Sequence, residues 1–290
     1  MSSHAIEVTG LHKHYGDLHA VDGIDLEIRT GEVFALLGPN GAGKSTTVEI
    51  LEGFRKRTSG TVSVLGHDPE HATREWRSRI GMMLQTTSGR NFLTAREAIT
   101  HTGRVYPNPR DTDELLAAVG LTDKANAKPQ TLSGGMRRRL DVALAVVGNP
   151  ELVFLDEPTT GFDPEARRQF WTMIESLRSG GATILLTTHY MDEAEYLADR
   201  IAIINRGKVV ALDTPAGLRA RASGSTVSWR ADGVHHSEFS ATPTQFLRDL
   251  LAKTKGEIDA LEVTNPTLED VYLSLVDSGS AEPALEEAKA

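Results

Sequence analysis

One eight-residue segment limits the possible folds of this chain more than any other feature. Residues 38–45 read Gly-Pro-Asn-Gly-Ala-Gly-Lys-Ser and match the pattern G-x-x-x-x-G-K-[ST] without a mismatch. A short apolar run, residues 33–37, precedes the segment, and a helix-compatible stretch, residues 44–53, follows it. The segment is therefore predicted to join a buried strand to a helix, as a phosphate-binding loop does.

The chemistry of this loop suits a nucleoside triphosphate better than a plain Gly-rich turn between a strand and a helix. Glycines let backbone N–H groups turn toward an anion, and the N-terminus of the helix adds a partial positive charge. Lys44 can reach the β- and γ-phosphates, and the hydroxyl of Ser45 can ligate Mg²⁺. We expect ATP and Mg²⁺ as cofactors, with nucleotide contacts from Gly38, Pro39, Asn40, Gly41, Ala42, Gly43, Lys44, Ser45 and Thr46.

A second element far downstream carries two acids. Residues 152–155 form an apolar run that ends in Asp156 and Glu157. Ligands of a parallel sheet lie beyond the carboxyl ends of its strands, which places both acids near Mg²⁺ and an attacking water. Asp156 suits the metal, and Glu157 suits a general base or a group that orients the water. An acidic helix cap after the strand is the structural alternative.

Apolar runs and helix-compatible stretches alternate along most of the chain, which predicts an α/β domain with a largely parallel sheet. Residues 88–148 have a mostly helical pattern and are interpreted as an insertion into this domain. Residues 213–224 are rich in turn-forming and small residues, and a second set of strand and helix patterns follows them. We predict a domain over residues 1–222 with a helical subdomain at about 88–148, a small α/β accessory domain at 223–277 and a flexible acidic tail at 278–290.

Composition excludes several other classes of protein. The 290 residues include no cysteine, which excludes disulfide frameworks, thiolate metal sites and cysteine nucleophiles. The net charge of −9 argues against a non-specific nucleic-acid binder, so no nucleic-acid partner is expected. The sequence has no apolar run of about 18 residues, and its first ten residues lack a signal-peptide pattern. We therefore expect a cytoplasmic protein that acts at a membrane only through another polypeptide.

Residues 132–136, Leu-Ser-Gly-Gly-Met, resemble the LSGGQ signature of ABC-type ATPases, with Met136 in place of the usual Gln. The order of phosphate loop, signature and Asp-Glu strand is also that of the family. Ser133, Gly134 and Gly135 can begin a helix and present free N–H groups to an anion. Three arginines follow at residues 137–139, where cations oppose the helix dipole. They are interpreted either as functional groups or as solvated side chains.

Four further residues match positions of this family. Tyr15 resembles the aromatic residue that stacks under adenine, and Gln85 resembles the Gln that contacts Mg²⁺ and the water and links to a membrane partner. Asp163 resembles the loop residue that couples two nucleotide sites, and it is also placed to cap a helix. His189 resembles the switch His that contacts the γ-phosphate. Without the resemblance, a lone Tyr, Gln or His at these places would be an ordinary surface or core residue.

The resemblance covers about residues 4–222 and implies a P-loop NTPase fold of the ABC type, with a RecA-like core, an antiparallel β subdomain and a helical subdomain. Residues 265–272, Asn-Pro-Thr-Leu-Glu-Asp-Val-Tyr, resemble the ending of ATP-binding subunits of bacterial drug and polysaccharide exporters, the daunorubicin/doxorubicin type being the most similar group. The same segment predicts a helix capped by Thr267 with Asp270 at the capping-box position.

The resemblance also implies a mechanism. Two protomers pack head to tail with ATP between the phosphate loop of one and Ser133, Gly134 and Gly135 of the other, as a homodimer in the ATP-bound state. Coupling then passes through the segment around Gln85 to a separate transmembrane permease, on the cytoplasmic face of the cell membrane. Asp163 couples the two sites. The implied catalytic set is Lys44, Gln85, Glu157 and His189, and the implied metal ligands are Ser45, Gln85 and Asp156.

Two other functions stay open from the sequence. One is a soluble ABC ATPase that is not coupled to transport, although only one set of motifs and no long heptad run is present. The other is an ATP-binding regulator without hydrolysis, against which the intact Lys44, Asp156, Glu157 and His189 argue. The sequence identifies no cargo.

Overall fold

The computed structural model describes residues 4–83, 92–221, 224–231, 233–254 and 256–277. Gln85, the first residues of the predicted helical subdomain and the predicted tail lie outside these residues. The chain divides into two compact units, Met1–Leu212 and Asp213–Ala290.

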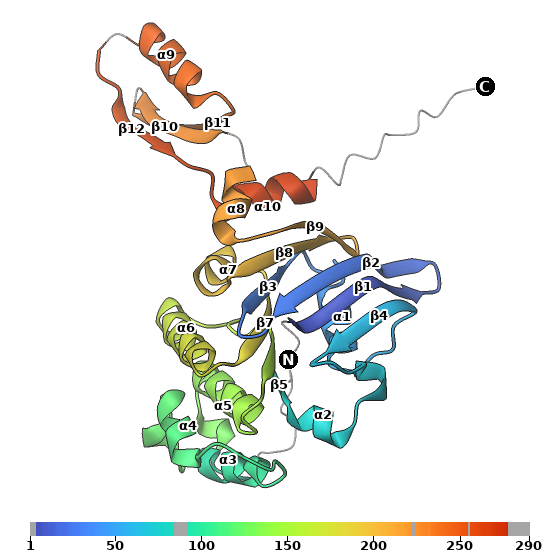
Figure 1. The fold of residues 1–290 in the computed structure, drawn as a ribbon. Coiled ribbons are helices and arrows are strands. Elements are labelled where there is room, and N and C mark those ends of the chain that lie inside the picture. Colours follow the sequence, from blue (N-terminus) through green and yellow to red (C-terminus); the bar gives the residue numbers. More distant parts are fainter. Residues whose placement is uncertain (1–3, 84–91, 222–223, 232, 255, 278–290) are drawn as a thin grey trace, which may run out of the picture. The chain divides into compact units, whose positions relative to one another are not determined.

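The centre of the first unit is a six-stranded sheet with the order β5-β6-β7-β3-β8-β9 (Figure 1). The pairs β5–β6, β6–β7, β7–β3 and β3–β8 are parallel, which confirms the predicted α/β architecture. Every residue of β3 and β7 is buried, as expected for apolar strands covered on both faces. The strands of this sheet are β3 (Val33–Leu37), β5 (Ile80–Met83), β6 (Leu152–Asp156), β7 (Thr183–Thr188), β8 (Arg200–Asn205) and β9 (Lys208–Asp213).

An antiparallel sheet with the order β2-β1-β4 belongs to the same unit. Its strands are β1 (His4–Tyr15), β2 (Leu18–Arg29) and β4 (Ser59–Val64). Along β2, buried and exposed residues alternate from Ile24 to Arg29, so one face of this sheet is buried. The core beneath it includes Ile6, Leu26, Val48 and Phe34, which come from both sheets and from the helix after the phosphate loop.

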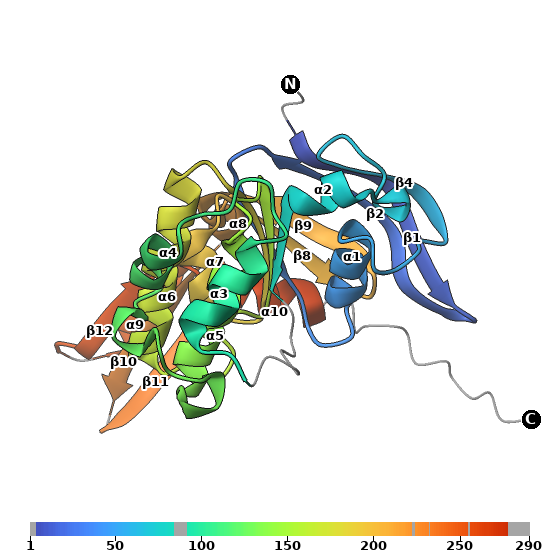
Figure 2. The same cartoon turned by 90° about the horizontal axis from the view of Figure 1, so that it is seen from below.

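Helices cover the parallel sheet and form a separate group beside it. Figure 2 shows α3 and α4 next to α5, away from the antiparallel sheet. A capping box at Thr94 and Glu97 begins α3. The helices of the first unit are α1 (Lys44–Leu51), α2 (Arg74–Ser78), α3 (Ala95–Gly103), α4 (Thr112–Ala118), α5 (Gly134–Val146), α6 (Pro164–Ser179) and α7 (Met191–Leu197), with short 3₁₀ helices at Pro69–His71, Thr122–Lys124 and Pro129–Thr131.

The second unit contains an antiparallel sheet with the order β11-β10-β12, against which α9 packs. Its elements are α8 (Pro215–Arg221), β10 (Ser225–Ala231), β11 (Val234–Ser240), α9 (Pro243–Lys253), β12 (Asp259–Thr264) and α10 (Leu268–Asp277). The predicted cap of the last helix is confirmed, because Asp270 N–H donates to Thr267 Oγ1 at 3.2 Å and Thr267 N–H donates to Asp270 Oδ2 at 2.8 Å.

The segment expected to be rich in turns contains a helix instead. Residues 215–221 form α8, because Thr214 Oγ1 accepts a hydrogen bond from Gly217 N–H at 3.0 Å and Pro215 occupies the first helical position. The turn-forming residues of this segment therefore act as the start of a helix.

Candidate nucleotide site

The phosphate loop joins β3 to α1, as predicted, and two of its glycines cannot carry a side chain in this conformation. A Cβ atom on Gly38 would lie 2.3 Å from the carbonyl oxygen of Ile204. Gly43 has φ 104°, and a Cβ atom there would lie 2.3 Å from the carbonyl oxygen of Ala20. The loop is thus held against β8 and β2, with the first turn of α1 directly after it.

Lys44 is buried at the start of α1, with only 5% of its surface exposed. Its Nζ donates to the carbonyl oxygens of Gly38 at 2.7 Å and Pro39 at 3.2 Å. Burial lowers the pKa of Lys44, and the charges of Glu157 and Asp156 act in the opposite direction. The ammonium group is therefore held over the loop by main-chain carbonyls and lies within electrostatic range of both acids.

The two acids lie at the carboxyl end of β6, as the sequence predicts. Thr187, on the neighbouring strand β7, donates its hydroxyl to Asp156 Oδ1. The backbone N–H of Glu157 donates to Thr187 O and Thr187 Oγ1, both at 3.1 Å. One threonine therefore positions both acids.

Glu157 has a strained backbone with φ 43°, which is uncommon for a residue with a side chain. Its carboxylate faces His189, whose Nδ1 lies 3.6 Å from Glu157 Oε1. Thr160 Oγ1 donates to the other oxygen at 3.4 Å. Because both side chains remain partly exposed, Glu157 and His189 can meet a water molecule and a phosphate from the same edge of the sheet.

Arg138 is a site residue that the sequence left undecided. Its guanidinium donates to the carbonyl oxygens of Asp156 at 2.8 Å, Glu157 at 2.9 Å and Pro158 at 3.0 Å. Burial lowers its pKa, and nearby acids, Asp141 the foremost, act against that effect. The interpretation as a solvated side chain is therefore wrong for Arg138, which ties the first turn of α5 to the strained segment after β6.

Tyr15 ends β1 and is 41% exposed. Lys13 Nζ lies 5.0 Å from the centre of its ring and Arg55 Cζ lies 5.4 Å from it. A partly exposed aromatic face at the end of a strand can stack on a base.

The signature residues line a different pocket. Ser133 caps α5 by accepting a hydrogen bond from Met136 N–H at 3.2 Å, and Gly134 and Gly135 open the helix as expected. Asp163 caps α6 in the same way, with Ala166 N–H at 2.8 Å from its Oδ1. The pocket has a volume of about 320 Å³ and is lined by Ser133–Met136, Arg139, Gly161–Asp163, Glu165, Ala166 and Gln169. No residue of the phosphate loop lines it, so the site divides into two separate parts within one chain.

Two acids with raised pKa values were not foreseen. Glu52 follows α1, and burial, helped by the charges of Asp156 and Glu49, raises its pKa to about 8. Glu193 on α7 is fully buried, which raises its pKa, and Trp171 Nε1 donates to it at 3.4 Å. Neither belongs to a sequence motif that would reveal it.

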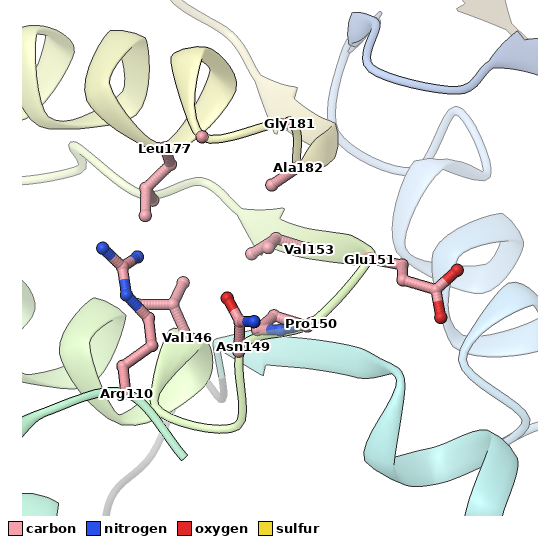
Figure 3. Close-up of a pocket in the computed structure, with 10 residues that line it drawn as sticks. Arg110, Val146, Asn149, Pro150, Glu151, Val153, Leu177, Gly181 and Ala182 are labelled. Carbon is pink, nitrogen blue, oxygen red and sulfur yellow. The ribbon is translucent and has the colours of Figure 1, made fainter. Parts of the chain in front are cut away.

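A further cavity of about 290 Å³ lies at the opposite edge of the sheet (Figure 3). Its lining includes Asn149 and Glu151, which lie just before β6, and Gly181 and Ala182, which lie just before β7. Arg110 also lines it. Ligands of parallel sheets bind at the carboxyl ends of the strands, so this cavity lies away from the predicted chemistry.

Comparisons with known proteins show the family of this chain. The family model described as ABC transporter matches residues 21–160. The daunorubicin/doxorubicin resistance ATP-binding protein DrrA of Streptomyces peucetius is 38% identical, over 98% of this chain and 97% of that protein. The linearmycin resistance ATP-binding protein LnrL of Bacillus subtilis is 37% identical, over 77% of this chain and 73% of its own.

A solved structure also resembles this fold. The dimeric post-hydrolysis state of the ATP-binding cassette MJ0796, bound to ADP and Pi, has a TM-score of 0.64 at 25% identity and covers 72% of this chain and 98% of its own. Among the described residues, no helix has the length and apolar character needed to span a bilayer. The chain belongs to the family of ABC transporter ATP-binding subunits, whose ATPase activity drives transport.

Proposed function

We propose that this chain energises an exporter of drug-like, amphipathic small molecules through ATP-driven head-to-tail dimerisation. The observation that carries the proposal is the division of the site into two parts. Lys44, Asp156, Glu157 and His189 lie at one edge of the sheet, whereas the signature residues line an open pocket of their own. Two copies arranged with two-fold symmetry would complete two such sites. The drug-resistance names of DrrA and LnrL support the cargo class.

The residues present fit MgATP. Backbone N–H groups in the first turn of α1 have no acceptor within the helix and suit a phosphate. The Ser45 hydroxyl and the Asp156 carboxylate are hard oxygen ligands of the kind that Mg²⁺ prefers. The family resemblance adds Gln85 as a third ligand, a residue outside the described ranges. When bound, Mg²⁺ neutralises charge on the β- and γ-phosphates.

In this proposal each side chain has one task. Lys44 leaves its carbonyl partners for the phosphates, and Tyr15 stacks under adenine. Glu157 orients or deprotonates the attacking water, and His189 holds the γ-phosphate. Ser133, Gly134 and Gly135 of the second copy close the site, and Asp163 links the two sites. Positioning and charge stabilisation carry most of the catalysis in phosphoryl transfer.

The permease would dock beside the helical part of the first unit, on the cytoplasmic face of the membrane. A shallow cavity of about 550 Å³ there is lined by Arg74, Arg77, Val105, Tyr106 and Pro107 and by two neighbouring residues of α2. Val105 is 60% exposed, which gives a cytoplasmic loop of a permease an apolar contact beside two cations.

The test is ATP hydrolysis with and without Mg²⁺, by the protein alone and reconstituted with its permease. We expect Glu157→Gln to bind ATP, to lose nearly all turnover and to accumulate as an ATP-bound dimer in analytical ultracentrifugation. Glu175→Gln, an exposed acid on α6, is the matched control and should behave like the wild type.

Three outcomes would contradict parts of this proposal. Wild-type turnover in Glu157→Gln would remove that residue from its role. Turnover that no permease alters would favour a soluble ATPase, and the absence of turnover under every condition would favour a regulator.

A further inference from the structure

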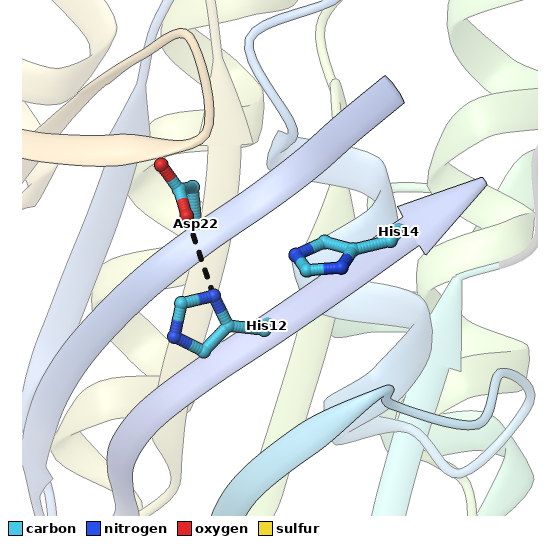
Figure 4. Close-up of side chains that lie close together, drawn as sticks. All are labelled: His12, His14 and Asp22. Atoms are coloured by element: carbon cyan, nitrogen blue, oxygen red, sulfur yellow. Dashed lines mark ion pairs between the residues drawn. The ribbon is translucent and has the colours of Figure 1, made fainter. Parts of the chain in front are cut away.

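A group of imidazoles and a carboxylate lies on the antiparallel sheet, outside the nucleotide site. β1 and β2 pair so that His12 is opposite Asp22 and His14 is opposite His19. Side chains of directly paired residues share a face of the sheet, and so do residues two apart on one strand. Figure 4 shows His12, His14 and Asp22 side by side on these two strands.

The spacing of the three side chains suits a metal ion. One ligand atom from each of His12, His14 and Asp22 lies within 4.8 Å of the others. His12 Nδ1 is 3.3 Å from Asp22 Oδ1, and the rings of His12 and His14 meet edge to face with centroids 5.7 Å apart. Zinc binds nitrogen and oxygen at about 2.0–2.2 Å, so rotations of the side chains would bring all three atoms to one ion.

Two ring nitrogens in this group lack hydrogen bonds. Within the part of the chain that the structure describes, His12 Nδ1 and His14 Nε2 are buried and have no hydrogen-bond partner. His12 Nδ1 faces Asp22 at ion-pair distance without the alignment of a hydrogen bond. Buried polar atoms normally have partners, and a shared ion would supply one for both rings.

The main chain of the three residues is anchored. Asp22 N–H donates to Gly207 O at 2.8 Å, His14 N–H donates to Thr58 Oγ1 at 3.0 Å, and the carbonyl of His12 accepts from Thr58 N–H at 2.8 Å. The backbone positions of the three residues are therefore fixed, and side-chain rotations alone are needed to bind an ion.

A cation of the protein already contacts this carboxylate. Lys208 Nζ lies 3.1 Å from Asp22 Oδ2, while Oδ1 faces His12. The side chain of Lys208 is 63% exposed and can turn into water when another cation arrives.

We propose that His12, His14 and Asp22 form a site for one divalent transition-metal ion of the zinc class, separate from the Mg²⁺ that accompanies ATP. Two imidazoles and a carboxylate suit such ions, whereas Mg²⁺ and Ca²⁺ prefer oxygen ligands alone. His19, stacked on His14 with ring centroids 3.9 Å apart, restrains the orientation of that ring. Lys208 is the competing cation.

The experiment is a titration of the full chain with Zn²⁺ against a chromogenic chelator, without nucleotide. We expect one equivalent to bind, and His14→Ala or Asp22→Asn to weaken it by at least about tenfold, the scale on which even outer-shell changes act. Lys208→Gln should bind Zn²⁺ more tightly than the wild type, a gain that a purely structural role of the cluster would not produce. His235→Ala, on β11 of the second unit, is the matched control and should leave affinity unchanged.

Either of two results would overturn the proposal. One is a wild-type chain that binds no stoichiometric Zn²⁺, and the other is unchanged affinity in Asp22→Asn. The Asp22→Asn variant keeps the shape of the side chain, so it decides the question even where His14→Ala loses its fold in circular dichroism.

Discussion

The two parts of the nucleotide site differ in how far one chain completes them. In the phosphate-loop part, Lys44 is buried against carbonyls of its own loop, and Glu157 is held by Thr187 and Arg138. In the signature part, the capping bonds are made but the surface is open, and a Cβ atom on Gly134 would meet nothing within 4 Å. One chain thus fixes the residues of the phosphate-loop part through its own contacts and leaves the surface of its signature open.

The largest expected effect separates the two parts by nucleotide affinity. Lys44→Ala removes a charge-assisted contact to phosphate of about 1.5–3 kcal/mol, so MgATP affinity should fall by about 10- to 100-fold and turnover should be lost. Ser133→Ala should leave the affinity of the monomer unchanged, because the signature lines another pocket. Calorimetric titration of MgATP measures both.

Two results would contradict the separation of the site into a phosphate-loop part and a signature part. Unchanged affinity in Lys44→Ala would mean that the loop is not the phosphate site. Weakened monomer binding in Ser133→Ala would mean that the two parts act on one nucleotide within a single chain.

Arg138 connects the two parts, so its removal should affect both. Arg138→Ala removes one donor from each of three carbonyl oxygens and should lower the free energy of unfolding by about 2–3 kcal/mol. Turnover should fall as well, because Glu157 loses a support of its strained backbone. Arg138→Lys keeps the charge but loses the forked geometry and should recover only part of the stability.

Chemical denaturation followed by circular dichroism measures this effect, with Arg137→Ala as the neighbouring control. Arg137 donates instead to Pro129 O at 3.2 Å and to Leu132 O at 3.5 Å. Equal stability losses in Arg137→Ala and Arg138→Ala would show that the contacts of Arg138 with the segment after β6 add nothing to the free energy of unfolding.

Substitution by alanine should affect stability at the glycine of the phosphate loop and turnover at the glycine of the signature. Gly38→Ala places a Cβ atom against the carbonyl of Ile204 and should cost about 1–3 kcal/mol of stability, as overpacking does. Gly134→Ala has room and should change stability by less than about 0.5 kcal/mol. In the proposed dimer, however, the added methyl would face the nucleotide, and a misplacement of about 1 Å can lower turnover by about 100-fold.

Thermal unfolding measures the stability of both glycine variants, and ATPase assays measure their turnover. Full activity in Gly134→Ala would show that the signature surface does not approach a nucleotide closely. A stable Gly38→Ala protein would show that the loop can shift away from β8.

The sequence predicted the parts of the fold that depend on local patterns. The bounds of β3 match the predicted apolar run of residues 33–37, because that run ends where the phosphate loop begins. The sequence analysis missed α8, because the segment is rich in turn-forming residues although Thr214 and Pro215 begin a helix there.

In the candidate site, too, some positions could be predicted from local patterns and others could not. Motif residues could be placed because the loop and the ends of parallel strands determine where they lie. The contacts of Arg138 could not be predicted, because they join carbonyls 18 to 20 residues away through tertiary packing. The pairing of His12 with Asp22 was equally hidden, since the register of β1 and β2 shifts on either side of His12. Contacts of this kind require the three-dimensional arrangement.

The last prediction concerns the pH dependence of stability that Glu52 imposes at the C-terminal end of α1. Its pKa is about 8 in the folded chain against an ordinary value of 4.5, so the folded state binds the proton more tightly than the unfolded state does. The contribution of Glu52 to stability is therefore most favourable below pH 4.5, decreases as the pH rises through the window from 4.5 to about 8, and is constant above it.

Glu52→Gln should match the wild type near pH 4.5 and become the more stable protein as the pH approaches 8. Unfolding curves across this range, with Glu175→Gln as the exposed control, measure the difference. Parallel pH profiles for wild type and Glu52→Gln would show that this acid is ionised at neutral pH and that its pKa is not raised in the folded chain.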